Sequence, residues 1–462
     1  MIWEPLVQTI TRQFRFIVAG FLLLAYAQGV SGATWKFLVY GDSRGTSTSS
    51  PINTQILGEL ATQTLVENPE FVLFPGDLAY SGSQANYNTW KSTMQPVYDA
   101  GIGVCPVAGN HESAALSAFK STFITPYTTA PFAGMSNLVV DSTAADGRSY
   151  TFSFNNALFL CMDNYSNAST SAHMVNQTFL DAQLAARNPT NTPLVFAMWH
   201  EPAFKAGQDT GLEAKPTQRN ATWTSLQNAG CRQVFNGHDH SYAAARLDDG
   251  DGNTNDDTYQ VVVGTAGAPL YAVAYSGDTG SWTVVPISSE SSYGYVRVVV
   301  DDVAQTVVQT WVHRTAANTF VDTANVLSYT YVVPSLTPFA TWQMQYFQCT
   351  SCPEAAADAD PDGDGMSNTN EFLTGTDPTN SASAFRITGV AQEGNDIRVT
   401  WIMGSGKTNA LQATTGDVTG GFTNNFADLF IATNTVGTTT NYLDLGAATN
   451  KPARYYRVRL VP

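Results

Sequence analysis

Basic residues are scarce in this sequence. Its 462 residues include 22 Lys and Arg against 38 Asp and Glu, so the formal net charge is −16. Nucleic acids and anionic membranes bind basic surfaces, because their own phosphates repel an acidic protein. The composition therefore argues against a nucleic-acid partner and favours cations as partners.

Long apolar runs are also few. The clearest, residues 16–27, follows Arg12 and Arg15 and precedes small residues, as in a secretion signal cleaved after Ala27 or near Gly32. It is too short to span a bilayer comfortably, although an uncleaved anchor is the alternative. We expect residues 1–32 to be a signal peptide, with a secreted, extracellular or periplasmic mature chain that has no membrane span.

Only five cysteines are present. Cys105, Cys161 and Cys231 lie in or beside apolar, strand-like stretches, which predicts buried thiols. Cys349 and Cys352 form a CxxC, which in a secreted chain favours a small disulfide loop. Zinc binding is the weaker interpretation, because no second pair of cysteines follows.

The length predicts two or three domains, and a 43% hydrophobic content predicts that most of the chain folds. Up to about residue 240, strand-like runs end in polar clusters and helical stretches intervene. This alternation predicts a largely parallel sheet, whose strand ends gather ligands. The runs are residues 36–40, 71–74, 103–107, 194–198 and 233–235, and the helical stretches are residues 52–66, 90–99 and 178–186.

Later segments have a different character. Residues 146–163 and 258–314 predict antiparallel flanking strands, which would close a domain of residues 33–330. Residues 331–383 form a predicted connector, and residues 384–462 predict a small all-β module, with the clearest strands at 397–401 and 455–460. This module contains no histidine, so contact with a surface or polymer and a purely structural role both stay open.

Five polar clusters follow the strand-like runs. Aspartate, asparagine and histidine are ligands for hard or borderline cations. Two such ions about 3.5–4 Å apart, bridged by a carboxylate, can clamp a phosphoryl group. The clusters predict a centre of this kind, and they are Gly41-Asp42-Ser43-Arg44, Gly76-Asp77, Gly109-Asn110-His111-Glu112, His200 and Gly237-His238-Asp239-His240.

In order and kind, these clusters resemble those of the calcineurin-like metallophosphoesterases, over roughly residues 35–315. Tyr80 stands three residues after Asp77, and the first cluster lacks a histidine, which resembles the purple acid phosphatases. The resemblance implies an α/β fold, an αββα sandwich. It implies Fe(III) held by Asp42, Asp77, Tyr80 and His240, and a divalent Fe, Zn or Mn held by Asp77, Asn110, His200 and His238.

The same resemblance implies an acid-phosphatase-like activity on a small phosphate ester. A metal-bound hydroxide would hydrolyse a phosphate monoester, with His111 assisting, Glu112 holding His111 and Arg44 reaching a phosphate oxygen. A surface role is the alternative for Arg44. The alternatives for the protein are a phosphodiesterase of the same fold and a phosphate- or surface-binding protein with weak catalysis.

The chain departs from the plant-type pattern in two places. Residues 201–212 contain no histidine, so either Glu201, Lys205 or Asp209 contributes to the pocket or the pocket works differently. Ala244 stands where an arginine is typical, and the nearest one is Arg246. Substrate preference is therefore open. His173 and His313 fit no cluster, and we interpret both as structural.

An acidic loop in the connector has the spacing of an EF-hand calcium site. Oxygen ligands clustered around a glycine turn suit calcium, and Met366 would add its backbone carbonyl. Asp358 and Asp377 resemble the extra acids of thrombospondin type 3 repeats; a solvated acidic linker is the alternative. The side chains at the loop positions are Asp360, Asp362, Asp364, Asn368 and Glu371, with Gly365 at the turn. A weaker candidate, residues 249–253, is better interpreted as a polar hairpin turn.

Overall fold

The computed structural model describes residues 34–126, 132–142, 148–165, 173–207, 210–347, 349–350, 352–433, 439–449 and 452–461. The predicted signal peptide and Asp209 lie outside these residues.

One sheet is built from the start and the end of the first domain. Its strand order is β16-β15-β14-β1-β4-β5. The strands β1, β4 and β5 run parallel, while β14, β15 and β16 add antiparallel neighbours at the other side. Their bounds are β1 (Thr34–Val39), β4 (Phe71–Phe74), β5 (Gly103–Pro106), β14 (Gly294–Asp301), β15 (Thr306–Ala316) and β16 (Thr319–Thr330).

A second sheet has the order β13-β11-β12-β10-β9-β8-β7-β6. Its central strands β8, β9, β10 and β12 are parallel, so the predicted parallel strands are divided between two sheets. The expectation that residues 259–263 form an antiparallel flanking strand was wrong in part, because β12 pairs in parallel with β10 and antiparallel only with β11. The bounds are β6 (Met135–Val140), β7 (Tyr150–Phe154), β8 (Ala157–Cys161), β9 (Leu194–Met198), β10 (Gln233–Asn236), β11 (Tyr242–Asp248), β12 (Thr258–Val263) and β13 (Thr283–Glu290).

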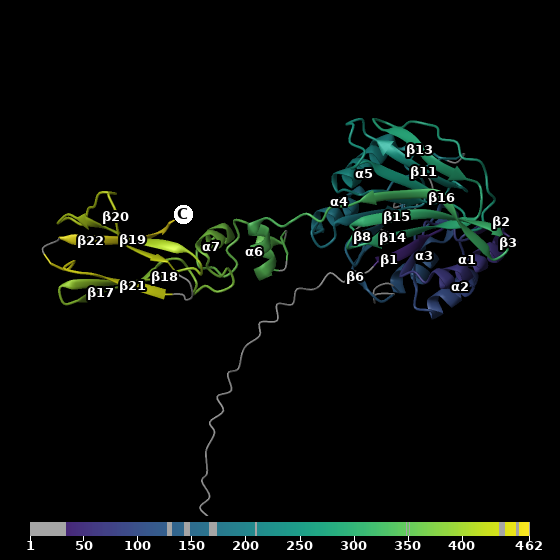
Figure 1. Cartoon of the computed structure of the whole chain (residues 1–462). Coiled ribbons are helices and arrows are strands. Elements are labelled where there is room, and N and C mark those ends of the chain that lie inside the picture. Colours follow the sequence, from purple (N-terminus) through teal and green to yellow (C-terminus); the bar gives the residue numbers. More distant parts are fainter. Residues whose placement is uncertain are drawn as a thin grey trace, which may run out of the picture.

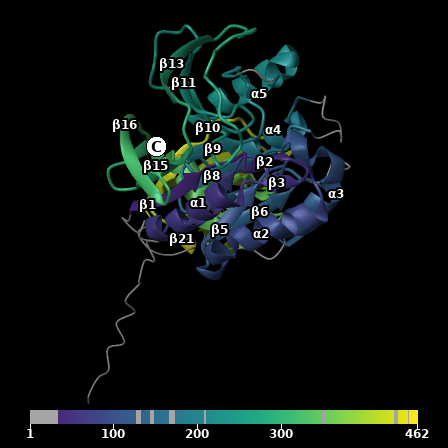
Figure 2. The ribbon, with the colours of Figure 1, turned by 90° about the vertical axis from the view of Figure 1, so that its right-hand side faces the viewer.

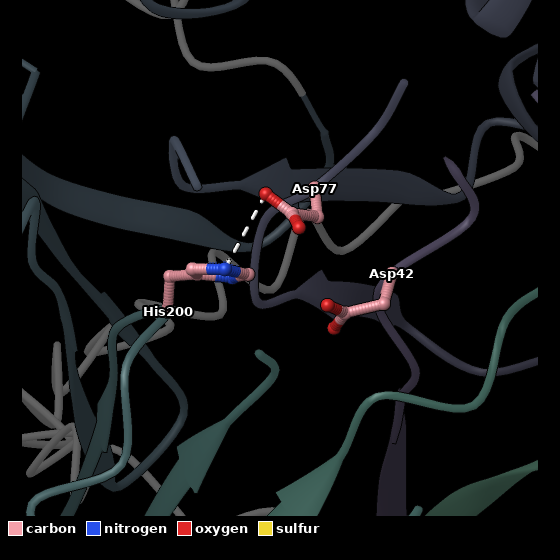
Figure 3. A group of neighbouring side chains, drawn as sticks. All are labelled: Asp42, Asp77 and His200. Carbon is pink, nitrogen blue, oxygen red and sulfur yellow. Dashed lines mark ion pairs between the residues drawn. The ribbon is translucent and has the colours of Figure 1, made fainter. Parts of the chain in front are cut away.

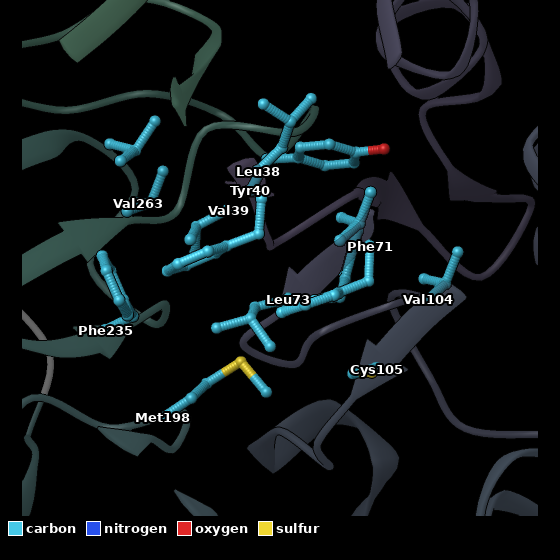
Figure 4. Packing of buried hydrophobic residues seen from close by; sticks show 14 of the residues in the cluster. Leu38, Val39, Tyr40, Phe71, Leu73, Val104, Cys105, Met198, Phe235 and Val263 are labelled. Carbon is cyan, nitrogen blue, oxygen red and sulfur yellow. The ribbon is translucent and has the colours of Figure 1, made fainter. Parts of the chain in front are cut away.

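The two sheets pack face to face through an aromatic core. Phe37 of β1 meets Phe159, Phe196 and Phe235 of the second sheet edge-on, with ring centroids 5.2–6.0 Å apart. Figure 4 shows part of this core, with Phe71 from the first sheet facing Met198 and Phe235 from the second. Successive strand residues point to opposite faces, so every second residue of β8–β10 is left for the helices outside.

Helices cover both outer faces, which gives the predicted αββα layers. Helices α1 (Thr54–Glu67) and α2 (Gln84–Asp99) pack on the first sheet. Helices α4 (Gln177–Ala186) and α5 (Pro216–Asn228) share a separate apolar cluster with β8, β9 and β10. Figure 2 shows α5 and the pair α1 and α2 on opposite sides of these strands.

Helix α2 begins six residues before the predicted start at residue 90. Its first turn is polar, so apolar periodicity gives no sign of it. The start is set by Ser83, whose hydroxyl accepts a hydrogen bond from the Asn86 amide (3.2 Å). Helix α1 likewise starts at a side-chain cap, Asn53, and ends at Asn68 in the left-handed region (φ 48°).

The rest of the chain forms a helical connector and a β module (Figure 1). The connector holds α6 (Pro338–Phe347), the predicted disulfide between Cys349 and Cys352, and α7 (Asn368–Thr374). In the module, two three-stranded sheets, β17-β18-β21 and β20-β19-β22, share a core around Trp401 and Leu411. The bounds are β17 (Ile387–Glu393), β18 (Asp396–Ile402), β19 (Thr408–Gly416), β20 (Ala427–Thr433), β21 (Thr439–Asp444) and β22 (Ala453–Val461).

Cys105, Cys161 and Cys231 are buried free thiols, as predicted. Among the helices of the described residues, none combines the length and the apolar character needed to cross a bilayer.

Candidate metal centre

Six of the predicted metal ligands gather where the two sheets end, three from each sheet. Asp42 follows β1, Asp77 follows β4, and Asn110 follows β5 at the start of the short helix η1 (Asn110–Ala115). His200 follows β9, and His238 and His240 follow β10. Figure 3 shows the side chains of Asp42, Asp77 and His200 converging on one space; oxygen and nitrogen atoms of the three lie within 4.8 Å of one another.

The contacts between ligands join the two sheets. His200 Nε2 lies 3.3 Å from Asp77 Oδ1 and 3.0 Å from Asn110 Oδ1. His238 Nδ1 lies 3.3 Å from the same Asn110 oxygen. His240 Nε2 lies 3.7 Å from Asp42 Oδ1. The fold therefore brings together every predicted histidine, aspartate and asparagine ligand.

Each histidine is oriented by a backbone carbonyl at its outer ring nitrogen. His200 Nδ1 is 2.7 Å from the Pro75 oxygen, His238 Nε2 is 3.0 Å from that of Thr210, and His240 Nδ1 is 3.0 Å from that of Pro269. A carbonyl accepts only from a ring N–H, so in a neutral ring the inner nitrogen carries a lone pair. Burial lowers the pKa of both His200 and His240 to about 4, which keeps these rings neutral.

The inner nitrogens fit metal ions. His200 Nε2 and His238 Nδ1 are 3.2 Å apart, and both face oxygen atoms that can only accept. Lone pairs at that distance repel one another unless a cation lies between them. Imidazole nitrogen, carboxylate and amide oxygen together form the donor set of an Fe, Zn or Mn site.

The carboxylates of Asp42 and Asp77 also favour the binding of positively charged ions. Burial, and then the charge of Asp77, raise the pKa of Asp42 well above its usual range. Burial alone would also raise the pKa of Asp77, but the facing rings of His200, His111 and His238 lower it. Two buried carboxylates side by side are costly without bound cations.

Glycines allow the close approach of the ligand loops. A Cβ atom on Gly109 would lie 2.2 Å from Asp77 Oδ1, and one on Gly237 would lie 2.2 Å from Asp42 Oδ2. Any larger residue before Asn110 or His238 would clash with these carboxylates, which explains the glycine at both positions.

Arg44 and His111 lie beside Asp77. The Arg44 Nε atom is 3.7 Å and the His111 Nε2 atom 3.8 Å from Asp77 Oδ2. His111 Nδ1 bonds to the Tyr80 carbonyl oxygen (2.5 Å). Tyr80 is half-buried, with its ring centroid 5.5 Å from that of His111. Its position is compatible with the predicted ligand role, which stays a prediction.

The predicted role of Glu112 was wrong. Its buried carboxylate does not hold the His111 ring; it accepts backbone hydrogen bonds from Asp77 (3.0 Å), Leu78 (3.1 Å), Ala79 (3.4 Å) and Gly109 (2.9 Å). Burial, and then the charge of Asp77, raise the pKa of Glu112 to about 8. Glu112 thus ties together the two turns that present Asp77 and Asn110.

The loop after His200 contains one interaction that the sequence did not reveal. Glu201 is buried, and its carboxylate binds the Tyr165 hydroxyl (2.5 Å) and His173 Nδ1 (2.9 Å). His173 fits none of the sequence clusters, so the sequence predicts only a structural role for it. His313 pairs with Glu290 (2.6 Å), Lys205 is half-buried, and Arg246 pairs with Asp257 on the β11–β12 hairpin.

Residues 36–242 match a family model described as calcineurin-like phosphoesterase. The chain contains a calcineurin-like phosphoesterase domain. The matched residues include all six gathered ligands as well as Tyr80, Arg44, His111 and Glu112. No curated protein matches the chain.

Solved structures with a similar fold include a purple acid phosphatase from yellow lupin (Lupinus luteus), at 14% identity and a TM-score of 0.49. That match covers 65% of this chain and 54% of the lupin chain, so it spans about half of the relative's length. A dimetal phosphatase from Danio rerio matches at 15% identity and a TM-score of 0.40, over 64% of this chain and 99% of that one. These similarities concern the fold alone.

Proposed function

We propose that this protein hydrolyses phosphate monoesters with two metal ions held by the calcineurin-like phosphoesterase domain. The strongest support comes from the inner ring nitrogens of the histidines. In neutral rings these nitrogens carry lone pairs and no proton, and they face carboxylate and amide oxygens that also carry no proton. Two bound ions would neutralise the phosphoryl group and activate water. Phosphodiesters are the second choice of substrate.

The chain's own residues position the ester and the ions. One carboxylate oxygen of Asp77 lies near His200, and the other lies near Arg44 and His111. This central position allows Asp77 to bridge two ions. Arg44 can donate to a phosphate oxygen, since its buried Nε atom has no hydrogen-bond partner among the described residues. His111 Nδ1 is held by the Tyr80 carbonyl, which leaves Nε2 to exchange a proton with the leaving group.

Metal content and the visible spectrum of the purified mature protein test this proposal. We propose an Fe(III) ion with Asp42, Asp77, Tyr80 and His240, and a divalent Fe, Zn or Mn with Asp77, Asn110, His200 and His238. About one iron and one divalent ion per chain, with a visible band that Tyr80→Phe removes, would support it. Tyr271→Phe is the matched control, because that ring lies 5.0 Å from His240 while its hydroxyl bonds the His238 carbonyl.

Other outcomes separate the alternatives. Two metals without the band would retain the hydrolase but reject the tyrosinate–iron centre. Full metal content without turnover of a chromogenic mono- or diester would favour a phosphate-binding protein. No metal after reconstitution would overturn the proposal. Secretion is a further proposal, and N-terminal sequencing of the mature chain tests it by showing whether cleavage occurs after Ala27 or near Gly32.

We also propose that the loop 360–371 binds calcium. Backbone amides of Gly363, Asp364, Gly365 and Met366 bond its first three aspartates and fold the loop. Five buried side-chain oxygens have no hydrogen-bond partner among the described residues; they are Asp362 Oδ2, Asp364 Oδ2, Asn368 Oδ1 and both oxygens of Glu371. A buried oxygen set of this kind is unfavourable without a cation.

Glu371 and Asn368 support calcium most strongly, because both are 0% exposed. The Asn368 amide nitrogen donates to the carbonyls of Glu354 (2.8 Å) and Ala356 (2.7 Å), which leaves its oxygen for the ion. Burial, and then the charges of Asp362 and Asp364, raise the pKa of Glu371 to about 7. All ligands are oxygens, which suits calcium.

Calcium titration by calorimetry tests this site. Glu371→Gln should weaken binding at least roughly tenfold, because it removes a buried anionic ligand. Glu354→Gln, an exposed neighbour, should leave the affinity unchanged. Absence of binding to the unaltered protein, or equal affinity in the Glu371→Gln variant, would reject the site. Surface or polymer contact by the β module stays a proposal that deletion of residues after 357 would test by measuring attachment.

A further inference from the structure

Glu201 connects the metal centre to a histidine outside the predicted ligand set. It directly follows the ligand His200, and the backbone amides of both residues donate to Asn164 Oδ1 (3.1 and 3.3 Å). The Glu201 side chain is buried, and Tyr165 and His173 occupy one carboxylate oxygen each. The position of His173 is therefore fixed relative to His200 through two short links.

His173 is the part of this group that solvent can reach. Its side chain is 19% exposed, whereas that of Glu201 is 1% exposed. Its backbone lies in the left-handed region (φ 44°), an unfavourable conformation that contacts such as the bond to Glu201 help to maintain. Nδ1 is bound to Glu201, and Nε2 has no hydrogen-bond partner among the residues that the structure describes.

Electrostatic effects and a neighbouring loop link this histidine to the metal centre. The charge of Glu201 acts on the ring of His200, and that of Asp77 acts on the Tyr165 hydroxyl. The loop at residues 210–215 is near both His238 and His173. The Thr210 carbonyl bonds the ring of His238, and the charges of Glu213 and Lys215 affect the pKa of His173.

We propose that His173, oriented by Glu201, is a phosphate-binding residue that donates a hydrogen bond from Nε2 to a non-bridging oxygen of the ester. It would complement Arg44 and His111, which lie after strands β1 and β5 of the first sheet, with a donor from the segment between β8 and α4. The inference rests on the proposed hydrolysis of phosphate esters, and Glu201 has the part of a positioning residue.

Charge supports this role. The hydrogen bond to Glu201 raises the pKa of His173, burial opposes the rise, and Glu201 and Glu213 favour the protonated ring while Lys215 disfavours it. The groups that act on the ring are thus Glu201, Glu213 and Lys215, with Tyr165 on the far side of the carboxylate. A protonated imidazole donates at Nε2 and attracts a phosphate dianion.

The variant His173→Asn tests the role in the metal-loaded full chain. The asparagine amide can replace Nδ1 as the donor to Glu201, but it removes Nε2 and the charge. The inhibition constant of inorganic phosphate should rise at least roughly tenfold, since a charge-assisted hydrogen bond is lost. In the unaltered protein, phosphate affinity should fall as the pH rises through the His173 pKa, and the variant should lack this pH-dependent step.

His313→Asn is the matched control. His313 also donates from Nδ1 to a glutamate, Glu290, but it lies on β15 and takes no part in the metal centre. Its replacement should leave the phosphate affinity and its pH profile unchanged. An unchanged affinity in both variants would overturn the proposal.

A second measurement is independent of turnover. NMR titration of the histidine rings in the metal-loaded protein should give His173 a higher pKa with saturating phosphate than without it. If phosphate binds and this pKa stays the same, or if phosphate does not bind, the His173 proposal is overturned. If the protein does not hydrolyse the ester but phosphate still raises the pKa of His173, the proposed hydrolytic function is rejected and the proposed phosphate-binding role of His173 is retained.

Discussion

Three residues of the metal centre adopt a backbone conformation that side-chain-bearing residues rarely take. The φ angles are 61° for Asp42, 52° for Asp77 and 68° for His238. Each such residue costs about 1–3 kcal/mol, so the surrounding contacts must hold it in place. The polar clusters indicated the candidate metal ligands, but a local pattern cannot show the loop geometry that orients their side chains.

Glu112 is one of the residues that hold the backbone of Asp77 in this conformation, so replacing it tests the effect of a single side chain. Glu112→Gln should lower metal affinity by roughly 10–100-fold, because an amide cannot accept from all four backbone N–H groups that the carboxylate binds. Metal titration of the stripped protein measures this. The exposed Glu70→Gln variant serves as the control, and an unaltered affinity in a folded Glu112→Gln protein would contradict the restraint.

The convergence of the six candidate ligands could be predicted from sequence, because each follows an apolar strand. The Glu201–His173 pair could not, because its members are 28 positions apart and meet only through tertiary structure. The role of Glu112 was missed for a related reason. Its partners are backbone amides, which leave no trace in the identity of the residues that carry them.

At the scale of elements, buried strands were predicted well and edge strands poorly. The runs at 71–74 and 194–198 coincide with β4 and β9, whose residues are all buried. Strand β16 lies beyond the residues predicted to form strands; it is at the edge of its sheet and has many exposed residues. An edge strand packs little apolar surface, so its sequence lacks a continuous hydrophobic run.

Helix α1 is fastened to the β15–β16 hairpin by one buried carboxylate. Glu59 accepts from Arg314 Nε (2.6 Å) and Nη2 (3.0 Å) and from the Asn318 amide (2.9 Å). These contacts, led by the hydrogen bond from Arg314, lower the pKa of Glu59 to about 2. Glu59→Gln should therefore destabilise the protein by about 2 kcal/mol at neutral pH.

The pH dependence of this loss identifies its cause. A depressed folded-state pKa gives stability that is complete above the unfolded value near 4.5 and is lost as the pH falls through about 2. Denaturant unfolding of both proteins should show the difference shrinking across this window. A difference at pH 2.5 as large as that at pH 7 would show that packing, and not charge, causes it.

At the scale of the whole molecule, the chain has separate hydrophobic cores. The phosphoesterase domain holds the two large clusters, and the β module has its own around Trp401 and Leu411. Rings of Phe339 and Trp342 on α6 contact Phe372 on α7, so the connector has its own packing beside the acidic loop at residues 360–371. These parts should unfold in separate steps.

Calorimetry with and without a calcium-selective chelator tests that separation. Removing calcium should lower the transition of the connector and β module and leave the phosphoesterase transition in place. At free calcium of 100 times the dissociation constant, the stabilisation lost is about 2.7 kcal/mol. The Glu371→Gln protein should not respond to the chelator. A shift of both transitions, or of neither, would contradict this arrangement.

The division of the ligands between the two sheets has a consequence for when the protein acquires its metals. The first sheet supplies oxygen donors, from Asp42, Asp77 and Asn110, and the second supplies the nitrogens of His200, His238 and His240. A nascent chain therefore exposes its oxygen donors long before the last nitrogen at residue 240 has been synthesised. Neither set alone makes the centre, so metallation has to follow the meeting of the sheets. The proposed metal ions would therefore be acquired in the compartment where the chain finishes folding.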